Sequence, residues 1–399
     1  MKKQKKFNGE RLKSARMYNG YTLTELSKIT NISKQSLSLY ENGNNKPEWD
    51  NISKISVALG FPRDFFLQES DFKVSTDATY FRALTSVTKK DRTAQKIKLE
   101  YLSQIYLTLF EYIDFPSLKI PYIDFSLTEV FETDEELQNI EDVADKIRKY
   151  WGLGSEPILD LRYILESNGM IVTSFDADAE KIDAFSQRTN VNKGEVYLIA
   201  ISAYGQTIAR ARFDMAHELG HILLHPWSED LELISKEEFR ARERQANIFA
   251  GAFLLPKETF RQDVSPYPTT LDYYLHLKKK WNVSIAAMIY RAYQLKVVTN
   301  NQFQYLMRQL SKNGWRKNEP LDTEYKLQNN ILQSAVDMLI NNNVFSGKQL
   351  LAELAQKGLS MYPEQIEDLL CLKHGTLSKG EEDKSQIIHL KDYIPPSAR

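Results

Sequence analysis

The sequence has 399 residues, enough for two to four domains, and its 42% hydrophobic and 26% charged residues are typical of a globular protein. It contains no run of about 18 apolar residues, which excludes a membrane-spanning helix. The lysine-rich start is not followed by an apolar stretch, so we expect no signal peptide. Cys371 is the single cysteine, which excludes an internal disulfide and fits a reducing, cytoplasmic location.

The charge is distributed unevenly along the sequence. Residues 1–68 contain twelve Lys and Arg against six Asp and Glu, so this segment carries a net charge of +6. Because the whole chain has a net charge of −1, the remaining residues carry −7. A basic segment on an acidic body predicts a polyanionic partner for the first 68 residues alone.

These first 68 residues have the pattern of several short helices. Thr22 to Glu25 form a capping box that opens a helix through Thr30, and Ser33 is the N-cap of a second helix that ends at Asn42-Gly43. A further helix is expected over about 49–59. The expected core consists of Leu26, Ile29, Ile32, Leu37, Tyr40, Ile52, Ile55 and Leu59. Two short helices around a tight turn in a basic segment indicate a helix-turn-helix, with a generic three-helix module as the alternative.

The segment ELSKITNISKQSLSLYENG resembles the Xre/Cro-type repressor domain of phages, and the resemblance extends to about residue 68. In that family the second helix enters the major groove through its N-terminal residues. The resemblance implies double-stranded DNA as a partner, with Lys34 and Gln35 at base edges and Ser36 near a phosphate. Two residues depart from the family's pattern. Leu23 replaces a glutamine that often contacts the DNA backbone, and Leu39 replaces a polar base-reading residue, although leucine can contact a thymine methyl.

Residues 69–135 are expected to form a helical connector. They begin with a polar stretch and continue into a long amphipathic helix over about 92–112, beyond which Pro116 and Pro121 mark a break. The apolar stripe of this helix consists of Ile97, Tyr101, Ile105, Leu109 and Tyr112. We expect the helix to space two functional domains, to pair with a second subunit, or to pack into the core of the following domain.

The pattern after residue 136 is mixed and predicts one domain over 136–320. Helices are expected over 137–151, 158–167, 271–281 and 284–295, and strands over 170–175, 182–188 and 195–202. Residues 321–399 are expected to add two or three amphipathic helices and a polar tail from residue 379. The predicted fold class is therefore mainly α with a small β-sheet (α+β), headed by a helix-turn-helix bundle.

The most informative motif is His217-Glu218-Leu219-Gly220-His221, within an apolar run that predicts a buried helix ended by Pro226. Residues four apart share a helix face, so His217 and His221 can present their imidazoles to one metal ion. Glu218 would lie beside the open position of that ion. There a carboxylate can accept a proton from water and pass it to a leaving amine. The alternative is that both histidines pack in a core helix with ordinary partners.

A second helix, expected over 236–254, supplies the third candidate ligand. Glu243, Ala246, Asn247 and Ala250 share one face of it, and this face is small enough to lie close to Gly220. Glu243 is the carboxylate on that face, so we expect it to be the third metal ligand. Asn247 is one turn further on and could support the metal site, with ordinary helix contacts as the alternative.

Other residues near the motif are expected to have different roles. The acidic residues nearer in sequence are expected at a solvated surface or at a helix N-terminus, and they are Glu229, Asp230, Glu232, Glu237 and Glu238. His225 shares the face of the two histidines, but it lies about 12 Å from His217 along the helix axis, too far for one tetrahedral site. We expect His225 to be either a cation at the helix C-terminus or a group that supports the metal ligands.

The runs ARARFDMAHELGHILLH and ERQANIFAGAFLLP, in this order and spacing, are similar to the ImmA/IrrE family of metallopeptidases. The resemblance extends from KIRKYWGLG to NGWRKNEP and covers roughly half the chain. It implies a gluzincin-like site in which His217, His221 and Glu243 bind one Zn²⁺ and Glu218 acts on water. It also implies a protein substrate, a repressor, whose cleavage relieves transcription of mobile elements or stress genes.

These features predict a cytoplasmic DNA-binding regulator with a zinc endopeptidase activity. A homodimer is expected, because one recognition helix covers only a half-site. One alternative is a non-catalytic regulator that uses the metallopeptidase fold as a sensor or partner-binding module. Another is a regulator that cleaves itself, most plausibly between Phe72 and Thr93. The combination of three ligand candidates with Glu218 favours the enzyme, because a binding role alone would not require all four residues.

Overall fold

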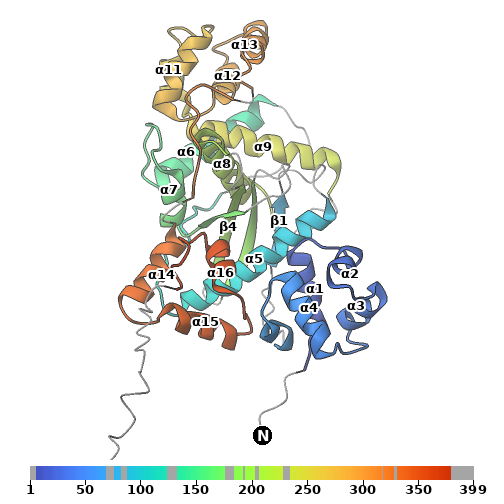
Figure 1. Ribbon diagram of the computed structural model, residues 1–399. Helices are drawn as coiled ribbons and strands as arrows, with labels where there is room; N and C mark the ends of the chain where they lie inside the picture. The colour runs from blue at the N-terminus through green and yellow to red at the C-terminus, as the bar shows by residue number, and fades with distance from the viewer. Residues whose placement is uncertain are drawn as a thin grey trace, which may run out of the picture.

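The computed structural model describes residues 6–68, 76–81, 88–123, 133–175, 184–191, 194–202, 206–227, 234–316, 318–327 and 330–378 of the 399-residue chain. Helices predominate, and one small sheet lies near the centre of the molecule (Figure 1). The predicted fold class, mainly α with a small sheet, is therefore confirmed. Among the described residues, no helix is both long enough and apolar enough to cross a membrane.

The N-terminal head comprises α1 (Gly9–Tyr18), α2 (Leu23–Thr30), α3 (Lys34–Glu41), α4 (Trp49–Leu59) and the 3-10 helix η1 (Arg63–Leu67). The capping box between Thr22 and Glu25 and the N-cap at Ser33 are both present. They confirm the two helices and the turn of the predicted helix-turn-helix. The predicted core is buried except at Ile29, which is 52% exposed. That prediction was wrong because α2 turns Leu26 and Thr30 inward and Ile29 outward.

The long helix of the expected connector, α5 (Lys89–Phe110), is part of the core. Its predicted stripe is buried apart from Tyr112, which lies beyond the helix end and is 40% exposed. Other faces of α5 are buried too, through Leu102, Ser103, Tyr106 and Thr108. Tyr101 stacks on Tyr18 of the head, and its hydroxyl lies 2.5 Å from Ser14 Oγ. Because α5 is covered nearly all round, core packing is the interpretation that the structure supports.

The sheet has four strands, β1 (Thr76–Phe81), β2 (Ile171–Phe175), β3 (Ala184–Val191) and β4 (Gly194–Ser202), in the order β1-β3-β4-β2. β3 is antiparallel to both of its neighbours, and β2 runs parallel to β4. β2, β3 and β4 confirm the three predicted strands. β1 belongs to the expected connector and was not predicted, because its short sequence TDATYF has no sustained alternation of apolar and polar residues.

The sheet separates two hydrophobic cores. Val172, Ile199 and Ile201 face one core, which they share with α8 (Ile208–Leu224) and α9 (Lys236–Leu254). Ile171, Leu198 and Ala200 face the other core, which they share with α5 and the head. Successive strand residues point to opposite faces, so burial of both faces explains why Ile171 and Val172 of β2 and the run from Val196 to Ile201 of β4 are apolar.

The remaining helices surround these cores. They are α6 (Asp134–Tyr150), α7 (Leu161–Ser167), α10 (Lys257–Val264), α11 (Leu271–Trp281), α12 (Ile285–Gln294), α13 (Asn300–Lys312), α14 (Ile331–Asn341), α15 (Gly347–Gln356) and α16 (Pro363–Leu370). Helices α14 to α16 confirm the helical C-terminal region, whereas the polar tail from Lys379 lies outside the described residues.

The head is packed against the C-terminal region as well as against α5. Arg11 Nη2 donates to Gly358 O at 2.6 Å, and Gln68 Nε2 donates to Ala355 O at 2.7 Å. In Figure 1 the head and the C-terminal helices lie on the same side of the sheet, next to α5. The head therefore shares a core with the rest of the chain.

Candidate metal centre

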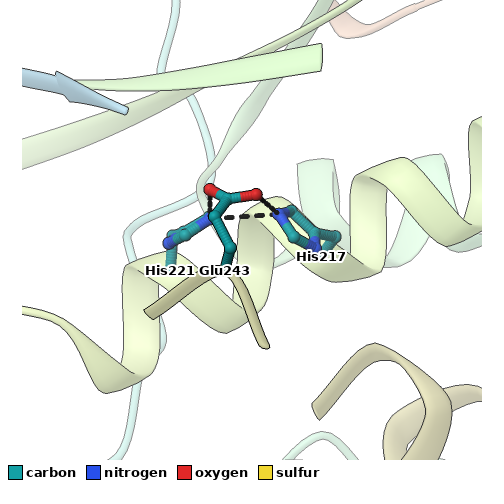
Figure 2. A group of neighbouring side chains, drawn as sticks. All are labelled: His217, His221 and Glu243. Carbon is teal, nitrogen blue, oxygen red and sulfur yellow. Dashed lines mark hydrogen bonds and ion pairs between the residues drawn. The ribbon is translucent and has the colours of Figure 1, made fainter. Parts of the chain in front are cut away.

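Helices α8 and α9 pack closely, and a glycine permits the contact. A Cβ atom on Gly220 would lie 3.1 Å from Ala246 Cα and 3.1 Å from Phe249 Cδ1. Both distances are shorter than ordinary van der Waals contacts, so the predicted approach of the second helix to Gly220 is confirmed. The packing brings Glu243 of α9 to the two histidines of α8 (Figure 2).

We expect Gly220→Val to lower the free energy of unfolding by about 1–3 kcal/mol, because overpacking at this contact forces the two helices apart. Gly251→Ala on α9 is the matched control, since a Cβ atom there would meet its nearest neighbour at 3.8 Å. That change should be neutral or stabilise the helix by up to about 1 kcal/mol. Denaturant unfolding of both variants measures the effect. Equal stability of Gly220→Val and the wild type would contradict the close packing.

Three side chains converge on one point between α8 and α9. Glu243 Oε2 lies 3.5 Å from His217 Nε2, Glu243 Oε1 lies 3.2 Å from His221 Nε2, and the two Nε2 atoms are 3.0 Å apart. Ligand atoms bonded to a tetrahedral zinc ion at about 2.05 Å are separated by about 3.3 Å. The measured separations scatter around this value, so the three atoms fit such an ion. Within the described part of the chain, this is the group of His, Cys, Asp and Glu that could hold a metal ion.

The charges in this cluster suit metal binding. Burial alone would raise the pKa of the Glu243 carboxyl, but interactions with the side chains of His217 and His221 lower it by more, so that the pKa is about 2. Glu243 is therefore ionised at neutral pH, as a metal ligand must be. His217 is fully buried and His221 is 1% exposed, whereas the Glu243 side chain remains 17% exposed.

Glu218 is fully buried where α8 faces the sheet. The hydroxyl of Ser186 on β3 donates to Glu218 Oε2 at 2.5 Å. This short hydrogen bond to a carboxylate fixes the orientation of the side chain next to His217. Ser186 could not be identified from the sequence, because its position depends on how β3 packs against α8.

Asn247 contacts His217 as the sequence suggested. His217 Nδ1 lies 3.1 Å from Asn247 Oδ1. An amide oxygen can only accept, so the proton of this imidazole is on Nδ1. The lone pair of His217 is therefore on Nε2, the atom that faces Glu243. This arrangement is the one in which an outer hydrogen bond orients a metal-binding histidine.

A chain of three hydrogen bonds orients His221 in the same way. Gln245 Nε2 donates to Glu136 Oε1 at 2.6 Å, so Gln245 Oε1 faces His225 Nε2 at 3.0 Å. His225 Nε2 must donate to this oxygen, which leaves His225 Nδ1 as an acceptor. His221 Nδ1 lies 2.9 Å away and donates to it. The lone pair of His221 is therefore on Nε2, inside the cluster.

One of our two interpretations, that His225 is a cation at the helix end, is wrong. Burial lowers its pKa well below the ordinary value, and His221 lowers the pKa further, so the imidazole is neutral at physiological pH. Its hydrogen bond to His221 agrees with the other interpretation, in which His225 supports the metal ligands. The spacing of the motif could suggest His225, but Gln245 and Glu136 were missed because they meet only through the packing of α6 on α9.

The other acidic residues near the motif are not part of the cluster as far as the structure describes them. Glu229, Asp230 and Glu232 lie outside the described residues. Glu237 and Glu238 occupy the first turn of α9, as expected, and Glu238 Oε1 pairs with Arg242 Nη2 at 2.5 Å. The third candidate ligand is therefore Glu243, as the pattern of the helix face predicted. It lies at least one turn further along α9 than Glu237 and Glu238.

The predicted DNA-binding residues lie on α3. Lys34 and Gln35 are exposed at its N-terminus, and Ser36 and Leu39 are half-buried. The Ser36 hydroxyl accepts a hydrogen bond from Ser33 Oγ at 2.8 Å, so it belongs to the helix cap. Leu23 packs against the core of the head. The N-terminal end of α3 is accessible although the head is packed against the rest of the chain.

Comparison with known proteins agrees with both parts of the structure. Residues 12–66 match the helix-turn-helix family, and residues 165–293 match the IrrE N-terminal-like domain of peptidase family M78. The second match includes the whole candidate metal centre on α8 and α9. The chain thus joins a helix-turn-helix domain to an IrrE N-terminal-like domain, as the sequence motifs predicted.

A similarity to one curated protein concerns the head. The chain is 32% identical over 69 residues to the SPbeta prophage-derived uncharacterized HTH-type transcriptional regulator YonR of Bacillus subtilis (strain 168). The aligned segment is 17% of this chain and 64% of that relative. The similarity therefore supports the nature of the head and leaves the activity of the whole chain to be inferred from its own residues.

Proposed function

We propose that this protein is a DNA-binding transcriptional regulator with a zinc-dependent endopeptidase activity, which cleaves a repressor-type protein and so relieves repression. The observation that carries the proposal is the cluster of His217, His221 and Glu243. Its interatomic distances of 3.0, 3.2 and 3.5 Å match a tetrahedral ion. Glu218 is the neighbouring carboxylate, and a DNA-binding type of head is part of the same chain.

Two imidazoles and one carboxylate are a ligand set of catalytic zinc sites, which leave a fourth position for water or substrate. Zinc bound there would polarise the scissile carbonyl and lower the pKa of water. Glu218 is placed to accept the proton of the attacking water and to return it to the leaving amine. Ser186 holds Glu218 in position, while Asn247 and His225 hold the two imidazoles with Nε2 toward the place that the ion would take.

The head supports the proposed substrate and setting. A repressor-type head would bring the peptidase to operators at which a second repressor is bound. We therefore propose cleavage in trans of such a repressor, by a cytoplasmic homodimer on a near-palindromic operator. Self-cleavage is the competing route, and its most plausible window, Phe72 to Thr93, lies partly outside the described residues. Intact mass of the wild-type chain before and after induction separates the routes, since cleavage in trans leaves the chain whole.

One observation favours a non-catalytic role. His217 and Glu218 are fully buried, as expected of a module that only senses a metal or binds a partner. Affinity purification of the Glu218→Gln chain from its own cells tests the two functions. A repressor-type protein should co-purify with this variant and be found cut in cells with the wild type. An identical transcriptional response in both strains would contradict the peptidase function.

We expect Lys34→Ala combined with Gln35→Ala to remove the preference for the operator while leaving salt-sensitive nonspecific binding. The reason is that both side chains are exposed where α3 would meet base edges, whereas other basic residues of the head remain to contact phosphates. Each lost bidentate base contact should cost about 1–3 kcal/mol of discrimination. Fluorescence anisotropy with operator and random duplexes measures the effect. Lys96→Ala, at an exposed position of α5 outside the head, is the control.

A further inference from the structure

The two histidines and the candidate base of the metal centre are buried in this structure, and of the four residues only Glu243, whose side chain is 17% exposed, reaches the surface. His217 and Glu218 are fully buried and His221 is 1% exposed, so the carbonyl of a peptide cannot reach them in this conformation. Part of the surrounding structure must move before a substrate can bind. The sheet beside Glu218 identifies a segment that is suited to move.

β3 is the strand in contact with the candidate base, through the hydrogen bond from Ser186 to Glu218. One side of β3 pairs with β4, so its other side would be the open edge of a sheet made of β3, β4 and β2 alone. Such an edge binds an extended peptide as an added strand, through main-chain hydrogen bonds. A peptide on this edge would lie alongside the residue that holds the base.

β1 occupies this edge. It runs antiparallel to β3, and Tyr80 is paired with Ser186, the residue that contacts Glu218. In Figure 2 strands of the sheet pass above the three side chains of the cluster, on the side to which the Glu243 carboxylate points. β1 therefore holds the place that a substrate strand would take next to the candidate metal centre.

The regular pairing of β1 with β3 is short. Its register slips between Thr76 and Thr79, so that regular pairing is confined to Thr79–Phe81 opposite Phe185–Gln187. A short, irregular edge strand gives up few ladder hydrogen bonds when it leaves the sheet. An extended segment of another protein, able to form a longer ladder on β3, could replace it.

We propose that β1 is a built-in occupant of the substrate edge of β3, and that a protein substrate binds by displacing it with an extended segment of its own. This proposal rests on the proposed peptidase function. It assigns the substrate class as a protein with a flexible or extended segment that adds antiparallel to β3. It also makes the conformation with the two histidines and the candidate base buried a resting state that is relieved only by a competing strand.

The first test frees the edge and measures binding of a defined strand. In the Glu218→Gln chain, which would bind but not cut, Thr79→Pro with Tyr80→Pro should release β1. N–H groups of successive strand residues point alternately to and away from the neighbour, so one of the two prolines removes a ladder donor. Thr79→Val with Tyr80→Thr keeps both N–H groups and is the matched control. The probe is a fluorescein-labelled peptide with the sequence of residues 74–83.

We expect the proline variant to bind this peptide at least about tenfold more tightly than the control variant, because the free edge is no longer shared with β1. Fluorescence anisotropy gives both affinities, and thermal unfolding of each chain verifies that the fold is intact. Equal affinities of the proline and control variants would overturn the proposal.

A crosslink provides the opposite change and does not depend on the proline variant. Thr79 and Gln187 are paired across β1 and β3, close enough for a disulfide between cysteines. A chain with Cys371→Ser, Thr79→Cys and Gln187→Cys should bind the labelled peptide weakly when it is reduced. Oxidation should abolish this binding, and reduction should restore it. Binding that survives oxidation would overturn the proposal. Because neither experiment requires hydrolysis, failure of the peptidase function would appear separately, as absence of any cleaved repressor.

Discussion

Glu218→Gln is expected to abolish hydrolysis while leaving zinc and operator binding unchanged. Loss of a general base lowers the rate by about 10²–10⁴-fold, because an amide cannot take the proton of the attacking water. The amide has nearly the same shape, and its oxygen can still accept the hydrogen bond that Ser186 donates at 2.5 Å. Mass spectrometry of the cleaved repressor gives the rate, and plasma mass spectrometry gives the zinc content.

Ser186→Ala is the matched control for this change, since it removes the hydroxyl and keeps the base. We expect it to lower the rate by only about 10–100-fold, as is typical for loss of a group that orients a catalytic residue. A wild-type rate in Glu218→Gln would show that this carboxylate is not the base.

His221→Ala and Glu243→Ala should each remove the metal. The wild type should retain about one zinc per chain through dialysis, whereas either variant keeps only two of the three ligand atoms that converge between α8 and α9. Unfolding by heat should also lose its dependence on added zinc in both variants, since a ligand that binds only the folded chain stabilises it. Full zinc content in Glu243→Ala would show that the third ligand lies elsewhere.

Two further variants test how specific this result is. Glu237→Ala, at an exposed position of the same helix, should retain full zinc content and is the matched control for Glu243→Ala. Gln245→Leu should weaken zinc binding by about 10–100-fold without abolishing it, because it breaks the chain of hydrogen bonds from Glu136 to His221. Unchanged zinc affinity in Gln245→Leu would mean that the orientation of His225 has no influence on the metal.

Sequence patterns predicted those parts of the molecule that depend on local spacing. His217 and His221 share a helix face whatever surrounds the helix, and the small residues around Glu243 fit only a helix that packs closely. The capping box at Thr22 likewise depends on residues three apart. These features need no knowledge of the tertiary structure, so they could be found in the sequence.

What the sequence did not predict depends on contacts between distant segments. Ser186 meets Glu218 only because β3 packs on α8, and Glu136 meets Gln245 only because α6 packs on α9. β1 was missed since its six residues lack the apolar alternation of a strand, and its pairing partner lies roughly a hundred residues further along the chain. The role of α5 was open for the same reason: its stripe predicted burial but not the elements that cover it.

Diffraction from crystals of the zinc-loaded protein, measured on both sides of the zinc absorption edge, would locate the metal and test whether His217, His221 and Glu243 hold a catalytic zinc ion beside Glu218. We expect one anomalous peak at about 2.0–2.2 Å from His217 Nε2, His221 Nε2 and a Glu243 oxygen, with a fourth position open toward Glu218. A peak between His221 and His225, or no peak between α8 and α9, would contradict it.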